Sequence, residues 1–204
     1  KAGRDIGELP AVVNPERKQK ASESFQFFCD AYFPMTFHLA WSPDHLKIIS
    51  KIEVAVLHGG LFALAMPRGS GKTTIAECAC LWAILFGHRE FVALIGASEV
   101  HAAEMLDSIK TELDGNELLL EDFPEAVFPI QALDGIANRC AGQLCQGERT
   151  HISWTEKEIV MPTIESSMAS GAIIKVAGIT GRIRGMKFKR ADGRSVRPSL
   201  VILD

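Results

Sequence analysis

The chain has 204 residues, of which 47% are hydrophobic and 23% charged, and its formal net charge is −3. These values are typical of one globular domain with enough chain to bury a core. They exclude a membrane-spanning helix, since no apolar run approaches the roughly 18 residues that a bilayer requires, and the N-terminus KAGRDIGELP lacks the apolar core of a secretion signal. The five cysteines are an odd number without the spacing of a disulfide scaffold, which indicates a reducing, cytoplasmic environment.

The first part of the chain is predicted to be a loosely held lead-in over 1–20 followed by helical segments. Residues 1–36 form a polar lead-in with an aromatic-rich helix over 25–33, and residues 37–204 form the main domain. The segment WSPDHLKIISKIEVAVLHGG (41–60) carries a helix-start signal, with Ser42 in the N-cap position and a proline and an aspartate directly after it. The glycine pair at its end is typical of a helix C-terminus.

The next segments alternate between apolar runs and helical patterns. LFALAM (61–66) and FVALIGAS (91–98) are continuous apolar runs of strand length, which predicts two strands buried on both faces. A helix is expected between them, over about 71–86. A further helix is expected from Glu99 to about Leu113.

The second half of the chain is predicted to complete a sheet. Residues 114–150 contain several DG, FP and QG breakers and are expected to be irregular. A hairpin is predicted over 152–162, and strands are predicted over 172–179 and 199–204. Strands that alternate with helices predict an α/β fold with a mainly parallel central sheet flanked by helices.

The segment MPRGSGKTT has the features of a phosphate-binding loop. In the usual pattern G-x-x-x-x-G-K-[ST], Met66 occupies the position of the first glycine. The predicted strand before the loop and the helix after it are what the mechanism requires, because backbone N–H groups from Gly69 to Thr73 then converge at a helix N-terminus, where the dipole favours anions. We expect Lys72 to contact the β- and γ-phosphates of a nucleotide and the Thr73 hydroxyl to bind Mg²⁺.

A second part of the site is predicted at the last residue. LVILD places Asp204 at the carboxyl end of an apolar strand, which is where an acid that binds Mg²⁺ directly or through a water in a phosphate-loop enzyme lies. The alternative is that Asp204 only caps a following segment. The combination of strand, loop, helix and distal acid favours a nucleotide site.

Charged residues are distributed unevenly along the chain. Residues 99–125 hold nine acids and one base. Residues 182–197 hold one acid, at a predicted turn over Asp192–Gly193, and seven bases: Arg182, Arg184, Lys187, Lys189, Arg190, Arg194 and Arg197. An acidic flank and a basic strip suit a protein that contacts a polyanion with one face only, although two solvated faces would also give such runs.

The loop resembles the variant phosphate loop of bacteriophage terminase large subunits, which often lack the leading glycine and carry an early arginine, as Arg68 does here. Three other segments resemble this family in the same order. FHLAWSPDHLKII (37–49) is similar to the adenine-side segment, with His45 where a glutamine is common. GITGRIRGMKF (178–188) is similar to the segment with an Arg-Gly pair, and RPSLVILD (197–204) to the lead-in of the Walker B strand.

The resemblance implies a RecA-like P-loop ATPase of the additional-strand, catalytic-glutamate (ASCE) type. Such subunits assemble as a homo-oligomeric ring and drive double-stranded DNA into a viral procapsid, using ATP and Mg²⁺, with a portal protein and a small terminase subunit as partners. The expected nucleotide-binding residues are Pro67, Arg68, Gly69, Ser70, Gly71, Lys72, Thr73 and Thr74 in the loop and Phe37, Trp41 and His45 on the adenine side. The two aromatic residues could instead belong to the core.

Individual roles are implied by the same resemblance. Lys72 would bind phosphate, and Thr73 and Asp204 would hold Mg²⁺. Arg68 would sense the γ-phosphate and Arg184 would act on the ATP of a neighbouring subunit, since a guanidinium can neutralise charge on the transferring phosphoryl group. Arg184 could alternatively contact a DNA phosphate or form a structural ion pair.

One departure from the family concerns catalysis. In terminases a catalytic glutamate follows the Walker B aspartate, whereas this sequence ends at Asp204. We therefore expect a fragment that lacks that glutamate and the C-terminal nuclease domain. We expect this fragment to bind nucleotide and to hydrolyse it weakly. The alternatives are a superfamily 1 or 2 helicase-like translocase, whose loop usually keeps the glycine that Met66 replaces, and a nucleotide-gated binding module that does not hydrolyse. A small-molecule kinase is disfavoured by the 131 residues between Lys72 and Asp204.

Overall fold

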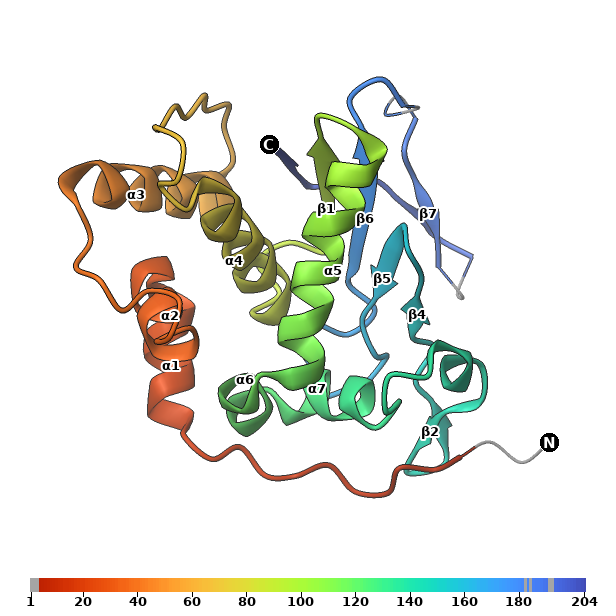
Figure 1. Cartoon of the computed structure of the whole chain (residues 1–204). Helices are drawn as coiled ribbons and strands as arrows, with labels where there is room; N and C mark the ends of the chain where they lie inside the picture. The colour runs from red at the N-terminus through yellow and green to blue at the C-terminus, as the bar shows by residue number, and fades with distance from the viewer. Residues whose placement is uncertain (1–3, 182, 184, 191–192) are drawn as a thin grey trace.

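The computed structural model describes residues 4–181, 183, 185–190 and 193–204 (Figure 1). The helices are α1 (Pro15–Glu23), α2 (Phe25–Tyr32), α3 (Pro43–His58), α4 (Lys72–Leu85), α5 (Glu99–Gly115), α6 (Glu117–Asp122) and α7 (Pro124–Gln131), with a 3₁₀ helix over Ala137–Gly142. The strands are β1 (Phe91–Gly96), β2 (Leu144–Cys145), β3 (Glu148–Arg149), β4 (Ser153–Trp154), β5 (Glu158–Val160), β6 (Ile173–Gly178), β7 (Phe188–Lys189), β8 (Ser195–Val196) and β9 (Leu200–Leu203).

The central sheet has five strands in the order β4-β5-β6-β1-β9. The strands β6, β1 and β9 are parallel, with Leu94 opposite Val176 on one side and Ile202 on the other. The strands β4 and β5 add an antiparallel hairpin beside β6. The three parallel strands therefore end at the same edge of the sheet, where loops from different parts of the chain meet.

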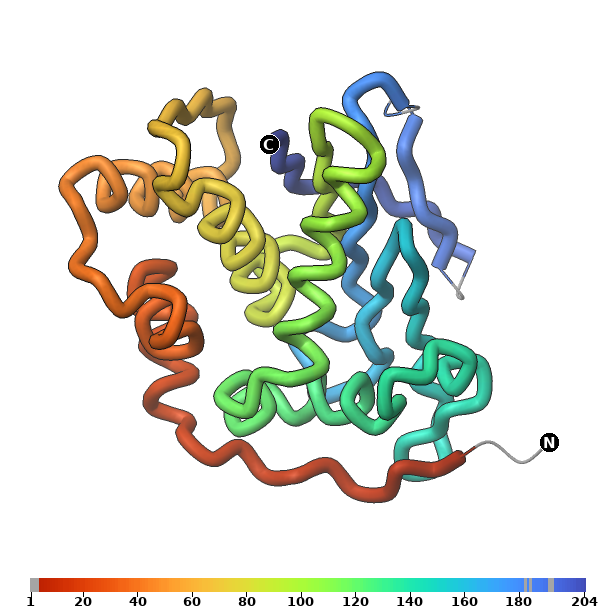
Figure 2. The backbone as a smooth tube through the Cα atoms, viewed as in Figure 1, coloured from red at the N-terminus to blue at the C-terminus, as the bar shows by residue number. Residues whose placement is uncertain are grey.

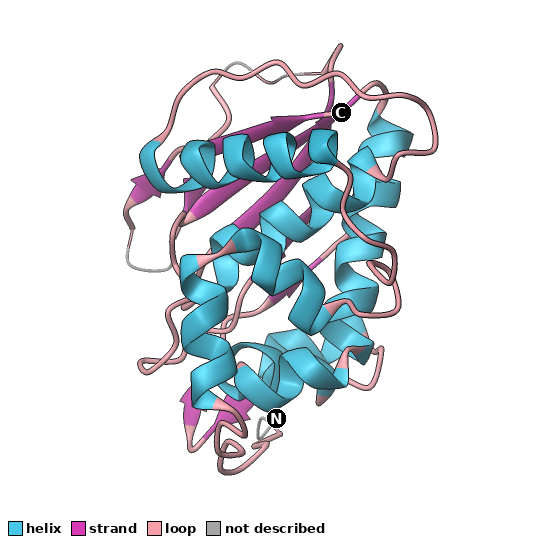
Figure 3. Cartoon of the chain, turned by 90° about the vertical axis from the view of Figure 1, so that its left-hand side faces the viewer, coloured by secondary structure: helices cyan, strands magenta, loops and turns pink. Residues whose placement is uncertain are grey.

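Different elements pack on the two faces of the sheet. Val92 and Leu94 of β1 belong to the main hydrophobic cluster, which includes the buried faces of α4 and α5. Phe91 points to the other face, where it joins a small cluster with Phe188 and Val196 of the β7–β8 hairpin. Seen from the α3 side, helices lie in front of the sheet (Figure 3). The molecule is thus a mixed α/β structure whose mostly parallel sheet is flanked by helices.

The N-terminal segment is tied to the rest of the domain. It passes beneath α6 and α7 before it enters α1 (Figure 2), and the backbone N–H of Val13 donates to the carbonyl of Glu121. In α1, Arg17 donates through Nε to Oδ2 of the fully buried Asp122, 2.6 Å away. The Tyr32 hydroxyl donates to the same oxygen at 2.6 Å, and burial together with this bond raises the pKa of the phenol. A buried carboxylate with these partners fixes α1 and α2 against α6.

Most of the predicted elements are confirmed. Helices form where the patterns over 25–33, 41–60 and 71–86 predict them, and strands form within 91–98 and 172–179. In α3, Ser42 accepts a hydrogen bond from the backbone N–H of His45 as the N-cap, and Gly59 is the C-cap. The helix after β1, the hairpin within 152–162 and the final strand are also present. The predicted turn over Asp192–Gly193 lies in part outside the described residues.

The prediction of a buried strand over 61–66 is wrong. The segment is extended but has no strand partner in the described part of the chain, and the Leu61 side chain is fully exposed. An apolar run becomes a strand only where a neighbour supplies backbone hydrogen bonds, and here a groove separates the segment from β9. The apolar composition alone could not show this.

The prediction of irregular structure over 114–150 is also wrong in part. Two short helices, α6 and α7, occupy its first half, and β2 pairs with β3 in its second half. Asn116 accepts a hydrogen bond from the backbone N–H of Leu119 and so caps α6, and Pro124 begins α7 at a position where proline is favourable. Tertiary packing of Leu119 and Val127 in the core then stabilises helices that are too short to form alone.

Candidate functional site

The loop before α4 turns sharply at its two glycines. Gly69 has a φ of 76° and Gly71 a φ of 74°, both in the left-handed region that glycine adopts without steric cost. Gly71 is the N-cap of α4, so the helix starts at Lys72, as the sequence predicts. The loop therefore delivers the chain directly into a helix N-terminus.

The N-terminus of α4 differs in its capping from those of α1, α2, α3 and α5, and shares the lack of a side-chain cap with α7. Asn14, Ser24, Ser42 and Ser98 each accept a backbone N–H at the start of α1, α2, α3 and α5. Gly71 has no side chain to do so. The first helical N–H with a carbonyl partner is that of Ile75, which donates to Gly71 at 2.9 Å. The amides before it are therefore oriented along the helix axis, away from its body, in the arrangement that binds anions.

The structure brings Thr73 and Asp204 together across 131 positions of sequence. The Thr73 hydroxyl donates to Oδ2 of Asp204 at 2.6 Å. This contact exists because Asp204 follows β9, whose parallel pairing with β1 carries its carboxyl end to the start of α4. The two residues that the sequence assigns to Mg²⁺ are therefore adjacent.

Side chains within the loop bond to its own backbone. The Ser70 hydroxyl donates to the Pro67 carbonyl at 2.8 Å, and the Lys72 ammonium donates to the Met66 carbonyl at 3.2 Å. Arg68 is exposed at the turn, and Thr74 lies in the first turn of α4. The predicted loop residues thus form one compact unit, with the cation of Lys72 held beside it.

The three predicted adenine-side residues form a row next to the loop. The rings of Phe37 and Trp41 are 4.8 Å apart, and those of Trp41 and His45 are 5.7 Å apart in an edge-on arrangement. His45 lies within hydrogen-bond distance of the Ser70 carbonyl, 3.0 Å from its Nε2. Both aromatic residues are partly buried against the main cluster. The row therefore connects the core to the phosphate loop.

Two further residues near Asp204 are not indicated by the sequence motifs. Nε2 of His101 in α5 is 3.9 Å from Oδ2 of Asp204. Burial raises the pKa of the Glu77 carboxyl, and the negative charge of Asp204 adds to this shift, while a hydrogen bond from Ser108 opposes it. The position of His101 could have been inferred, because it lies in the first turn of the helix after β1, whose end adjoins that of β9.

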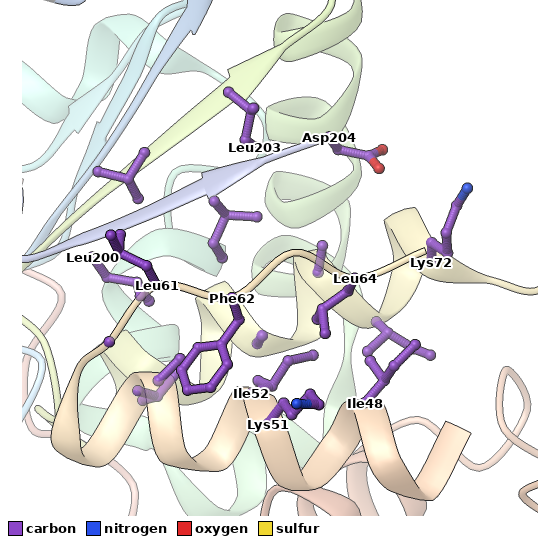
Figure 4. A pocket seen from close by; sticks show the side chains of 18 of the residues that line it. Ile48, Lys51, Ile52, Leu61, Phe62, Leu64, Lys72, Leu200, Leu203 and Asp204 are labelled. Atoms are coloured by element: carbon purple, nitrogen blue, oxygen red, sulfur yellow. The ribbon is translucent and has the colours of Figure 1, made fainter. Parts of the chain in front are cut away.

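A groove of about 390 Å³ extends from the loop between β9 and the 61–66 segment (Figure 4). Leu200 and Leu203 of β9 line one wall, and Phe62 and Leu64 line the other. Lys72 and Asp204 lie at the same end of it (Figure 4). The apolar groove and the polar loop are therefore continuous.

The basic strip is only partly described. Arg184 lies outside the described residues, as does Arg182, so its predicted role stays a prediction. Lys187 and Lys189 are exposed at the β7–β8 hairpin. Arg190 forms an ion pair with Glu90 at 3.2 Å.

The oxygen atoms of Thr73 and Asp204 fit a magnesium ion that is bound together with phosphate. Mg²⁺ prefers oxygen ligands and is usually held by one or two protein groups, phosphates and waters. Among the described residues there is no group of three or more histidine, cysteine, aspartate or glutamate side chains that could hold a metal.

Comparison of the chain with protein-family models, with curated proteins and with solved structures found no match. Within the described residues, the helices are all too short or too polar to cross a bilayer.

Proposed function

We propose that the chain is the ATP-binding and ATP-hydrolysing domain of a P-loop protein. The observation that supports this most strongly is the 2.6 Å contact between Thr73 and Asp204, beside a helix N-terminus whose cap is a glycine. A hydroxyl and a carboxylate from distant segments, next to unpaired amides and one lysine, are what Mg²⁺ and a triphosphate require.

Each residue has a distinct part in this proposal. The amides at the start of α4 bind the β-phosphate, and Lys72 leaves the Met66 carbonyl to contact the γ-phosphate. Thr73 and Asp204 would hold Mg²⁺, which would neutralise negative charge on the phosphates. Arg68 lies within the same loop as Lys72 and its side chain is exposed, so it can contact the γ-phosphate.

The finer proposal is a RecA-like ATPase of a viral DNA-packaging motor. It is supported by the resemblance of four segments to terminase large subunits and by the parallel strands that place Asp204 at the loop. Double-stranded DNA, a portal protein, a small terminase subunit and other copies in a ring are then the partners. A magnesium-dependent ATPase in the host cytoplasm follows from the same proposal.

The first experiment measures nucleotide binding. Wild-type chain is titrated with a fluorescent ATP analogue and Mg²⁺, beside Lys72→Ala and the control Lys47→Ala, which removes an exposed lysine of α3. We expect Lys72→Ala to weaken binding at least about tenfold, because it removes a charge-assisted contact to phosphate, and Lys47→Ala to bind normally. ATP hydrolysis is followed in the same samples. Equal binding by Lys72→Ala and wild type would show that the loop is not a nucleotide site.

A further inference from the structure

We propose that His45 is a positioning residue for the phosphate loop and not a contact for the adenine base. This inference rests on the proposed nucleotide site. It concerns how one peptide bond of the loop, between Ser70 and Gly71, is oriented before the phosphates bind.

The hydrogen bonds of His45 fix its tautomer. Nε2 lies 3.0 Å from the Ser70 carbonyl, which can only accept, so Nε2 carries the proton. Nδ1 lies 2.7 Å from the Ser42 hydroxyl, and in the neutral ring it accepts from that hydroxyl. The same Ser42 oxygen accepts the backbone N–H of His45 as the N-cap of α3, at 3.3 Å. All five groups are satisfied by this one arrangement, which ties the start of α3 to the loop.

The bond to Ser70 determines the direction of the next amide. In a trans peptide the carbonyl and the following N–H point in opposite directions. Because the Ser70 carbonyl points to His45, the N–H of Gly71 points away from α3. The left-handed conformation of Gly71 then continues the chain into α4. Without His45, the loop would keep the hydrogen bonds from the Ser70 hydroxyl to Pro67 and from Lys72 to Met66, but neither of these involves the Ser70 carbonyl.

The polar groups of the His45 ring are already occupied within the protein. Its ring packs edge-on against Trp41, and the Trp41 indole N–H donates to Asp30 at 2.8 Å. Both ring nitrogens of His45 already have partners in the protein. A hydrogen bond from His45 to adenine would need one of these bonds to break, whereas a positioning role uses both of them.

The test compares two ligands, of which one carries an adenosine and the other is the triphosphate chain alone. Binding of Mg-ATP and of magnesium tripolyphosphate is measured by calorimetry for wild type, His45→Ala, His45→Met and His45→Gln, with His38→Ala as an exposed histidine control. We expect His45→Ala and His45→Met to weaken both ligands by a similar factor, about three- to tenfold, as for loss of one hydrogen bond. We expect His45→Gln to restore binding, because its amide can donate to Ser70 and accept from Ser42.

The alternative outcomes are distinct. If the His45 variants bind ATP more weakly but bind tripolyphosphate normally, His45 contacts the adenosine and the proposal is overturned. Normal binding of both ligands by His45→Met would also overturn it. His45→Met serves as a second variant of similar size if His45→Ala unfolds. If Lys72→Ala weakens both ligands while the His45 variants do not, the nucleotide site stands and only the positioning role fails. If Lys72→Ala has no effect, both proposals fail.

Discussion

At the scale of single residues, the charge of Glu77 links stability to pH. Its folded-state pKa is raised above 4.5, first by burial and then by Asp204. The folded protein therefore binds this proton more tightly than the unfolded chain does. The corresponding stabilisation is present below the unfolded pKa and is lost as the pH rises through the folded pKa.

We therefore predict that Glu77→Gln is more stable than wild type at pH 7 and that the difference disappears toward pH 4. Urea unfolding at a series of pH values measures this. Glu104→Gln, at an exposed position of α5, is the control and should show no such trend. A variant that is less stable than wild type at pH 7 would mean that burial does not penalise the ionised carboxylate.

At the scale of elements, the attachment of α1 depends on one buried charge. Asp122 is fully buried, and the Arg17 side chain is 19% exposed. We predict that Arg17→Ala lowers the free energy of unfolding by about 3–5 kcal/mol, since it leaves Asp122 buried without its cation. Lys20→Ala, at an exposed position of the same helix, should cost no more than about 0.5 kcal/mol. Chemical denaturation compares the two, and equal losses would contradict this role of Asp122.

The elements also show what the sequence could predict. Helix caps and glycines are local signals, so α3 and α4 and the turn between Gly69 and Gly71 were predictable from a few adjacent residues. The contact between Thr73 and Asp204 was predicted on the premise of a strand over 61–66, which does not form. The contact arises because α4 directly precedes β1 and β9 pairs with β1 in parallel. The absence of a strand over 61–66 was not predictable, because strand formation depends on a neighbouring strand that the local pattern does not specify. The bond from His45 to Ser70 likewise depends on how α3 packs beside the loop.

At the scale of the whole molecule, the sheet separates the charged regions. The acidic run lies mainly on α5, α6 and α7, where three of its acids, Glu121, Asp122 and Glu125, pair with α1. The β7–β8 hairpin carries Lys187 and Lys189 on the opposite face. The basic strip is therefore the side on which we place the polyanion.

We predict that double-stranded DNA binds with a steep salt dependence and that Lys187→Ala with Lys189→Ala weakens it. Each lost phosphate contact should reduce the slope of log K against log salt by about 1. Fluorescence anisotropy at several salt concentrations measures the slope. Lys20→Ala with Lys47→Ala removes two lysines of α1 and α3 as the matched control. Binding that does not respond to salt would exclude the strip as a DNA surface.

The decisive measurement for the nucleotide site is a crystal structure with Mn²⁺ and a non-hydrolysable ATP analogue. We predict an anomalous peak about 2.0–2.2 Å from both the Thr73 hydroxyl oxygen and a carboxylate oxygen of Asp204, with the phosphates against the amides at the start of α4. The 2.6 Å bond between the two side chains is then replaced by shared metal ligation. Phosphates or metal bound elsewhere, with that bond intact, would contradict the assignment.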